Sequence, residues 1–271
     1  MKDVNGKVVA ITGAAMGMGR IAAKRFAADG AHVALLDIKQ ADLDKTVAEI
    51  TAKGGTARGY LCDLGDRERI YKTFKKIEKD MGPVDVLFNN AGVVFGGALL
   101  ETDDDKLEAT IRINLTAHLW TMKAVLPGMI QKNAGHIINF ASAAGMVGVS
   151  LMATYCGSKA GVIGLTEAMR AEMLDQGHDG IKFTIVTPSY VTTGMFEGVR
   201  PPTFTPWLSP EGMVARIYKA FKNDKLFVRA PWIVYTIPAL KLFLPVKGVD
   251  LVAKSLKMNA TMKKWTGRKI S

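Results

Sequence analysis

The feature that most constrains the fold is a glycine-rich turn between an apolar strand pattern and a helix pattern. Residues 7–12 (KVVAIT) are apolar and β-branched, which is typical of a buried strand. The turn GAAMGMG follows at residues 13–19, and residues 20–29 read as an amphipathic helix. Glycines let a backbone approach a pyrophosphate, and a helix N-terminus supplies free N–H groups. The pattern predicts a phosphate-binding turn, with the spacing G-x-x-x-G-x-G rather than G-x-G-x-x-G.

The second strand pattern, residues 31–36, ends at Asp37. A carboxylate in this place can bind the adenosine ribose 2′-hydroxyl and repel a 2′-phosphate. Asp37 therefore favours NAD over NADP, with a simple strand cap as the alternative. The nearby cations Arg20 and Lys39 leave NADP open.

Strand and helix patterns continue to alternate along the chain. Helices are expected over residues 40–53, 66–81, 103–132, 152–176 and 209–222, and strands over 56–62, 84–89, 136–142, 181–187 and 225–228. Such alternation builds a parallel sheet with helices on both faces. We therefore predict a Rossmann-like, doubly wound three-layer αβα sandwich with a seven-stranded parallel sheet and a helical C-terminal extension, in a single domain spanning residues 1–271.

Polar residues follow successive strands of this sheet. Asp63 follows the third strand, Asn90 the fourth, and Ser142 ends the fifth. Each can be an ordinary turn residue. Ligands on such sheets bind at the carboxyl ends of the strands, so these residues are expected to line one crevice.

Tyr155 and Lys159 lie four residues apart in the helix expected at 152–176, and so share one face. An ammonium beside a phenol lowers the phenol pKa from about 10 toward working pH. Such a phenol can exchange a proton with a substrate oxygen, and Ser142 can hydrogen-bond the same oxygen. Y-x-x-x-K alone is common by chance, and a surface pair on an ordinary helix is the alternative. Asn114, in mid-helix, is either a satisfied polar residue or a functional amide.

Composition narrows the class of partner. The net charge is +11, which suits anionic partners: nucleotides, acidic lipid or nucleic acid. No nucleic-acid recognition motif accompanies it. The two cysteines lack ligand spacing, so no metal site or disulfide framework is expected. The N-terminus has no signal-peptide core, and a cytoplasmic chain is expected.

Two later segments are distinctive. Residues 194–210 (GMFEGVRPPTFTPWLSP) are rich in Pro, Met, Phe and Trp, and are interpreted as a substrate lid, with a packed connector as the alternative. Residues 230–246 are apolar, and residues 241–271 carry eight Lys and Arg against Asp250 alone. This basic and apolar extension, 230–271, favours either peripheral contact with an anionic membrane or helices packed on the domain or on a second subunit.

Together, these residues resemble the short-chain dehydrogenase/reductase family over about residues 5–230. The resemblance is carried, in family order and spacing, by Thr12-Gly13-x-x-x-Gly17-x-Gly19, Asp37, Asp63, Asn89-Asn90-Ala91-Gly92, Asn114, Ser142, Tyr155 and Lys159. The chain has Pro188-Ser189 where the family often has Pro-Gly. Segments such as NNAGVVFGGALLE and YCGSKAGVIG are similar to the branch of retinol dehydrogenases and lipid-associated hydroxysteroid dehydrogenases.

The resemblance implies roles for individual residues. Tyr155 would be the general acid/base, Lys159 would lower its pKa and hold the nicotinamide ribose, and Ser142 would orient the substrate oxygen. Asn114 would anchor a water of the proton relay. The cofactor would be NAD, bound by Gly13, Met16, Gly17, Met18, Gly19, Asp37, Asp63, Leu64, Asn90, Ala91, Gly92, Tyr155, Lys159, Pro188, Val191 and Thr193.

The expected reaction is hydride transfer between NAD(H) and an apolar alcohol or ketone of steroid, retinoid or long-chain type. Most family members are homodimers or homotetramers, and the resemblance implies the same here. An NADPH-dependent 3-ketoacyl-type reductase is the alternative within the class. A nucleotide-binding scaffold and a peripheral membrane protein are the alternatives outside it.

Overall fold

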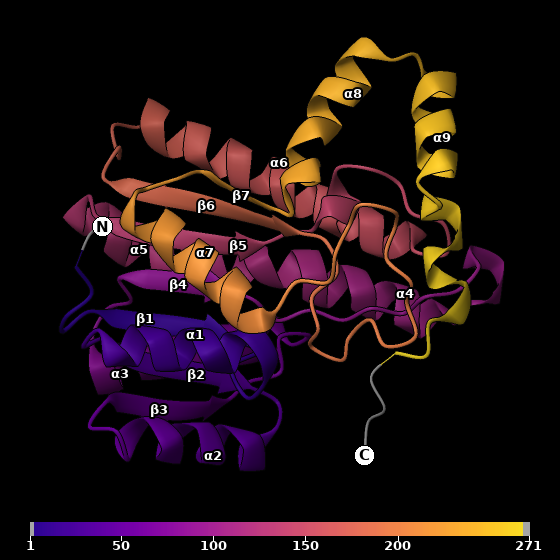
Figure 1. Ribbon diagram of the computed structural model, residues 1–271. Helices are drawn as coiled ribbons and strands as arrows, with labels where there is room; N and C mark the ends of the chain where they lie inside the picture. Colours follow the sequence, from indigo (N-terminus) through magenta and orange to yellow (C-terminus); the bar gives the residue numbers. More distant parts are fainter. Residues whose placement is uncertain (1–2, 268–271) are drawn as a thin grey trace.

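The computed structural model describes residues 3–267, so Arg268 and Lys269 of the basic extension lie outside the described residues. Its core is one parallel sheet of seven strands in the order β3-β2-β1-β4-β5-β6-β7 (Figure 1). The strands are β1 Val8–Thr12, β2 His32–Asp37, β3 Thr56–Leu61, β4 Val86–Asn89, β5 Gly135–Phe140, β6 Ile181–Pro188 and β7 Phe227–Ala230. The predicted seven-stranded doubly wound sheet is confirmed.

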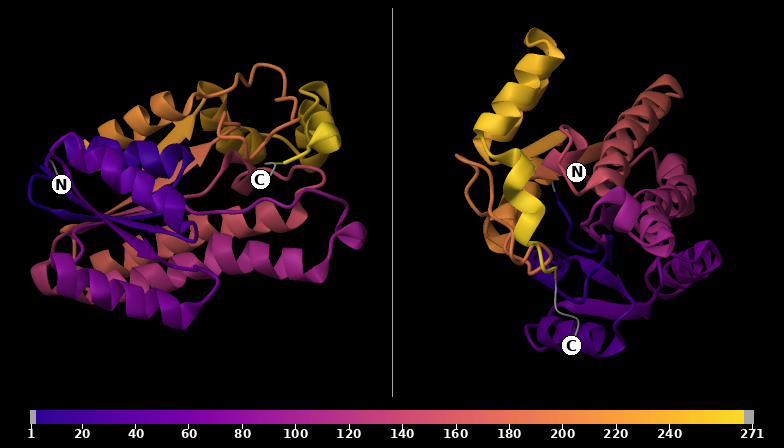
Figure 2. Two further views of the ribbon diagram at one scale, coloured as in Figure 1. Left: turned by 90° about the horizontal axis from the view of Figure 1, so that it is seen from below. Right: turned by 90° about the vertical axis from the view of Figure 1, so that its right-hand side faces the viewer.

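Helices cover both faces of the sheet (Figure 2). One apolar cluster joins the sheet to α1 Gly17–Ala28, α2 Gln40–Thr51 and α7 Pro210–Lys222. A second joins the opposite face to α3 Arg67–Met81, α5 Ala117–Lys132 and α6 Ala153–Asp175. Parallel strands buried on both faces need no polar alternation, which explains continuous apolar runs such as residues 8–12.

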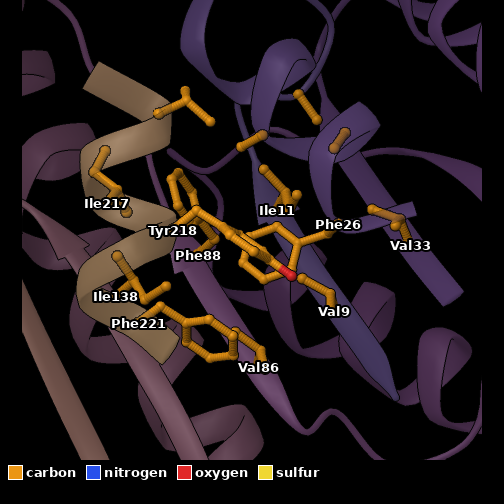
Figure 3. Packing of buried hydrophobic residues seen from close by; sticks show 14 of the residues in the cluster. Val9, Ile11, Phe26, Val33, Val86, Phe88, Ile138, Ile217, Tyr218 and Phe221 are labelled. Atoms are coloured by element: carbon orange, nitrogen blue, oxygen red, sulfur yellow. The ribbon is translucent and has the colours of Figure 1, made fainter. Parts of the chain in front are cut away.

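An aromatic cluster holds α1 and α7 against the sheet (Figure 3). Phe26 packs edge-to-face on Tyr218 and Phe221, with ring centroids 5.1 and 5.4 Å away, and on Phe88 of β4 at 6.2 Å. Such pairs add about 0.5–1.5 kcal/mol each beyond the burial of their surface. The cluster fixes α1, whose N-terminal end carries the glycine-rich turn.

Some element boundaries differ from the sequence expectation by more than a residue, and three differences matter for the site or for the sheet. Helix α1 begins at Gly17, three residues before the expected start, because the N–H of Arg20 already donates to the Met16 carbonyl. The single helix expected over 103–132 is divided into α4 Asp104–Ile111, a π-helical turn Arg112–Thr116 and α5. Strand β7 lies two residues later than expected.

The chain after β7 is helical, as predicted. It comprises a 3₁₀ turn Trp232–Thr236, α8 Ile237–Phe243, α9 Val246–Ser255 and a 3₁₀ helix Met258–Lys264. We call α8 and α9 the arch, because they stand away from the sheet (yellow in Figures 1 and 2). The chain then turns back, and we call residues 258–267 the strap. Over residues 3–267, no helix combines the length and apolarity needed to cross a bilayer.

Candidate active site

The glycine-rich turn is shaped by close backbone contacts. Gly13 has φ +65°, and a Cβ there would lie 2.9 Å from the Ala91 Cα atom. A Cβ on Gly19 would lie 2.1 Å from the Gly13 carbonyl oxygen. Only glycine fits at these two positions. Their lack of a side chain allows the tight turn that connects the carboxyl end of β1 to the start of α1.

Side chains from two strand ends hold this turn in place. Asn90 donates from Nδ2 to the carbonyl oxygens of Thr12 and Gly13, at 3.0 and 3.1 Å. The Thr12 hydroxyl accepts from the N–H groups of Asn90 and Ala91. The Asn90 side-chain amide therefore stabilises the turn, and Asn90 also lines the cleft.

Asp37 closes the far side of the turn. Its Oδ2 accepts from the Ala15 N–H at 3.0 Å, and its Oδ1 accepts from the Ile38 N–H at 2.8 Å. The side chains of the two nearby cations make different contacts. Arg20 pairs with Glu49 of α2, whereas Lys39 lines the cleft beside Asp37.

These elements surround a cleft of about 440 Å³ along the carboxyl ends of the strands. A methyl of Thr193 would lie 3.6 Å from a Cβ on Gly17, which places the chain after β6 across the turn. Gly19 does not line the cleft but packs beneath it. The predicted cofactor-binding residues that line it are Gly13, Met16, Gly17, Met18, Asp37, Asp63, Leu64, Asn90, Ala91, Gly92, Tyr155, Lys159, Pro188, Val191 and Thr193.

A second cavity, of about 230 Å³, lies beside the cleft and is lined mostly by apolar side chains. Residues 194–210 contribute Phe196, Pro202 and Thr205 to its wall. The arch and the residues next to it contribute a set that sequence reasoning did not assign: Ile233, Ile237, Leu240, Val249, Val252, Leu256 and Met258. The apolar pattern of residues 230–246 was the only sequence feature that could have indicated this wall. The pattern does not show which part of the protein these residues contact, because that depends on tertiary structure.

The strap also reaches the cofactor cleft, which the sequence did not indicate. Trp265 donates from Nε1 to the Met195 carbonyl at 3.2 Å, and the Thr266 N–H donates to the Glu197 carbonyl at 3.0 Å. Trp265, Thr266 and Gly267 line the cleft. Residues 194–200 are therefore held between the strap and the body of the protein.

Four residues line both the cleft and the cavity: Ser142, Tyr155, Ser189 and Phe196. Ser142 lies two residues beyond β5, and Tyr155 is in the first turn of α6. The Tyr155 ring packs edge-to-face on Phe196, with centroids 6.1 Å apart. The boundary between the two spaces therefore carries the hydroxyl groups predicted to do the chemistry.

The ionisation of Tyr155 differs from the sequence expectation. Burial raises the pKa of the phenol, and the hydrogen bond with Ser142 opposes this only in part. Burial also lowers the pKa of Lys159 to about 7. The Lys159 amine lies 5.9 Å from the centre of the Tyr155 ring. A cation that is partly neutral at pH 7 and lies at this distance does not offset burial, so the expected lowering of the Tyr155 pKa is wrong for the protein alone.

Asn114 is buried in the π-helical turn, and both its Oδ1 and its Nδ2 are hydrogen-bonded. Its Oδ1 accepts from the Val93 N–H at 2.8 Å, and its Nδ2 donates to the Val93 carbonyl at 2.9 Å and to Ser158 at 3.3 Å. The side chain ties the chain after β4 to the helix. π-Helical turns are frequent at functional sites, and this one lies beside Lys159.

Comparisons with known proteins agree with this geometry. The family model described as short chain dehydrogenase matches residues 7–203. Epidermal retinol dehydrogenase 2 of Mus musculus is 40% identical over 272 residues, which cover 99% of this chain and 88% of the mouse protein. Retinol dehydrogenase 10-A of Danio rerio is 38% identical over 275 residues, covering 92% of this chain and 81% of that relative.

Two solved structures resemble the whole fold. A short chain dehydrogenase/reductase from Burkholderia phymatum, in complex with NAD, superimposes with a TM-score of 0.82 at 24% identity, covering 93% of this chain and 97% of the other. A metagenomic short-chain oxidoreductase, in complex with NADP, gives a TM-score of 0.70 at 30% identity, with coverages of 84% and 99%. The sheet, the cleft and the extent of the family match lead to one conclusion: the chain belongs to the short-chain dehydrogenase family of oxidoreductases.

Proposed function

We propose that the protein transfers hydride between NAD(H) and an apolar alcohol or ketone of retinoid, steroid or long-chain type. The observation that carries this proposal is the boundary at which Ser142 and Tyr155 line both the cleft and the apolar cavity. Hydride transfer needs the nicotinamide and the reacting carbon in contact, and this boundary is where the two spaces meet. The similarity to retinol dehydrogenases supports the retinoid class in particular.

The cleft fits a dinucleotide. Its turn offers free N–H groups at the start of α1, and Asp37 lies where an adenosine ribose would be held. Solved relatives bind either NAD or NADP, so the choice depends on this chain's own residues. The Asp37 carboxylate, and the pairing of Arg20 with Glu49, support NAD. We assign cofactor contacts to the fifteen cleft-lining residues named above, and a supporting role beneath the turn to Gly19.

Tyr155 is the proposed general acid/base and Ser142 the group that orients the substrate oxygen. The raised pKa keeps Tyr155 protonated at neutral pH, so the phenol holds the proton that a ketone oxygen would take up on reduction. In alcohol oxidation Tyr155 must first lose its proton, and Lys159, with a pKa of about 7, can exchange protons at neutral pH. Bound nicotinamide supplies the hydride acceptor or donor. Because Nδ2 of Asn114 already donates two hydrogen bonds, a relay water at Asn114 would have to donate, either to Oδ1 or to the main-chain carbonyl.

We propose that residues 1–271 form one catalytic domain in which residues 194–210 act as a lid. Met195 and Phe196 line the cleft, and Phe196, Pro202 and Thr205 line the cavity, so this segment borders both ligands. Its apolar side chains would exclude water from the reaction.

The test is the absorbance of NADH formed from NAD⁺ with alcohols of increasing apolar size, up to retinol and a steroid, with NADP⁺ and Tyr155→Phe alongside. Turnover that rises with apolar size, prefers NAD⁺ and is lost in Tyr155→Phe is expected. A preference for NADPH and for ketoacyl substrates would favour the 3-ketoacyl-type reductase instead. NADH binding together with activity that survives Tyr155→Phe would refute the catalytic assignment.

We further propose a cytoplasmic protein in peripheral contact with anionic membrane through the arch. The tip of the arch exposes Leu242, Phe243 and Val246, whose side chains are each more than three-quarters accessible. Lys241 and Lys247 flank this tip, and Asp250 is the single acid of residues 231–271. Exposed apolar side chains with lysines next to them in the chain fit an interface of apolar lipid chains and acidic headgroups, although the Lys241 amine donates to the Met146 carbonyl.

Sedimentation of the full chain with phosphatidylserine and phosphatidylcholine vesicles tests this contact. We expect binding to the anionic vesicles that weakens with salt. If the same fraction of the protein stayed in the supernatant with both kinds of vesicle, the proposed membrane contact would be refuted.

A homodimer or homotetramer is proposed on family grounds. Leu119 of α5 and Leu174 of α6 are partly exposed apolar residues on core helices, which supports an interface there. Light scattering of the purified protein tests it, and a monomer at micromolar concentration would refute it.

A further inference from the structure

Trp265 of the strap is held in the wall of the cofactor cleft. Its indole Nε1 donates to the Met195 carbonyl of the lid at 3.2 Å. The ring packs closely on two glycines: a Cβ on Gly96 would lie 3.0 Å from ring atom Cε3, and a Cβ on Gly267 would lie 2.8 Å from Cζ2. The ring therefore has a fixed place between the chain after β4 and the lid, where it is partly accessible and lines the cleft.

The contacts of Trp265 show at which end of the cleft it lies. It packs against an apolar cluster that contains Tyr155, and Phe196 of the lid packs against the same cluster. Tyr155 lies at the boundary between the cleft and the apolar cavity. Asp37 lies instead against the glycine-rich turn, where the adenosine would be held. Trp265 is therefore at the end of the cleft where hydride transfer is proposed.

A partly accessible indole in a cleft presents a large apolar surface to water. Burying this surface against a ligand is favourable, and ring-to-ring packing adds a further contribution. The nicotinamide is the part of the cofactor that must reach the Tyr155 end, since it exchanges hydride with the substrate. A planar nicotinamide ring at this end would lie within reach of the indole.

We propose that the Trp265 indole covers the nicotinamide ring of the bound cofactor and excludes water from the hydride-transfer site. Exclusion of water strengthens the hydrogen bonds and charge interactions inside a closed site. Trp265 is thus a cofactor-binding residue that the C-terminal extension supplies to the cleft. This inference rests on the proposed use of a nicotinamide cofactor.

The experiment compares NADH with ADP-ribose, which has the same nucleotide half and lacks the nicotinamide ring. Dissociation constants are measured by calorimetry for the wild type, Trp265→Ala, Trp265→Phe and Trp232→Ala. We expect Trp265→Ala to bind NADH about tenfold more weakly, as for one lost aromatic contact, and to bind ADP-ribose as the wild type does. Trp265→Phe keeps an apolar ring without the Nε1 donor, and should restore most of the NADH affinity. Trp232, which is 71% exposed in the turn after β7, supplies the matched control, and Trp232→Ala should bind both ligands normally.

Quenching of NADH fluorescence by acrylamide tests the exclusion of water. The emission comes from the reduced nicotinamide ring, and acrylamide is uncharged, so the quenching constant reports access to that ring. We expect NADH bound to the wild type to be quenched several-fold less than free NADH. At saturating NADH, the quenching constant of the Trp265→Ala complex should approach that of free NADH. A tryptophan that only stabilised the fold would lower the melting temperature on substitution and leave the quenching unchanged.

Several results would overturn the inference. Equal NADH affinity of the wild type and Trp265→Ala would show that the ring does not contact the cofactor. Weakening of NADH and ADP-ribose by the same factor would show that the strap supports the cleft as a whole. Trp265→Phe as weak as Trp265→Ala would assign the effect to the bond between Nε1 and the Met195 carbonyl.

The wild type alone also supplies a decisive result, whether or not the variants fold. Wild-type-bound NADH that is quenched as strongly as free NADH would overturn the inference and leave the proposed function standing. Failure of the wild type to bind NADH would overturn the proposed function as well, so the two failures are distinguishable.

Discussion

The Lys159 amine donates to the main-chain carbonyl of Phe140 at 2.7 Å. This bond joins α6 to the last residue of β5 and holds the amine in the wall of the cleft. The side chain is buried, and this burial lowers its pKa to about 7. The amine is therefore fixed in position and has a pKa close to physiological pH, where it is partly protonated and partly neutral.

The first prediction concerns stability against pH. The folded pKa of Lys159 is about 7 and the unfolded value about 10.4, so between them the unfolded chain binds the extra proton. Wild-type stability should therefore rise with pH across this window, with the full penalty present below pH 7. Lys159→Met should be more stable than the wild type by about 1–4 kcal/mol at pH 7 and lose that advantage near pH 10.5. Urea unfolding of both proteins at the two pH values measures this, and an advantage independent of pH would contradict it.

Tyr155→Phe tests the general acid/base directly. The substitution removes only the phenolic oxygen and keeps the ring packed on Phe196. We expect kcat to fall by about 10²–10⁴-fold, the usual contribution of a positioned acid or base. NADH affinity should fall much less than kcat, since the ring still fills the boundary. A comparable loss of NADH affinity would show that the variant had damaged the cleft.

The sequence was sufficient to predict the parts of the site that depend on the local residue pattern. The turn at Gly13 and the acid at Asp37 follow from strand, glycine and helix patterns within forty residues. The wall formed by the arch was not predictable in the same way, because the contact of Leu240 with the cavity depends on how the extension folds back. The prediction of a lowered Tyr155 pKa was also wrong. Four-residue spacing shows that Lys159 is near, but it does not show how deeply both groups are buried.

Asp37→Asn should change the cofactor preference. The variant keeps an oxygen that can accept from the Ala15 or Ile38 N–H and removes the negative charge that faces a 2′-phosphate. We expect the ratio of kcat/KM for NADP⁺ to that for NAD⁺ to rise about tenfold or more. Asp44→Asn, which removes an exposed acid seven residues away, is the matched control. An unchanged ratio would mean that Asp37 serves only the turn.

The arch tip can be tested without deleting any part of the cavity wall. Phe243→Asp places a charge at an exposed apolar residue, and should weaken sedimentation with phosphatidylserine vesicles by about tenfold or more. Leu100→Asp makes the same change at a leucine that is 98% exposed in another part of the surface, and should have no effect. Equal losses in both variants would indicate a nonspecific effect of charge.

Gly198→Ala should detach the strap. A Cβ at this residue would lie 2.0 Å from the Lys264 carbonyl oxygen, and its φ is +81°. Gly177 has a similar φ of +78° in open space, so Gly177→Ala carries the same backbone strain, about 1 kcal/mol, without the clash. We expect Gly198→Ala alone to weaken NADH binding and shift the tryptophan emission as Trp265 leaves the cleft. Identical behaviour of the two variants would show that the strap does not contribute to the cleft.

The two ligand spaces draw on different parts of the chain. The glycine-rich turn and Asp37, which we propose select the nucleotide, lie within the first forty residues, whereas most of the cavity wall comes from residues after 188. Substitutions in that later region can enlarge or reshape the substrate space while the nucleotide end stays as it is. Related enzymes can therefore diverge in the alcohols they accept without altering the coenzyme they share.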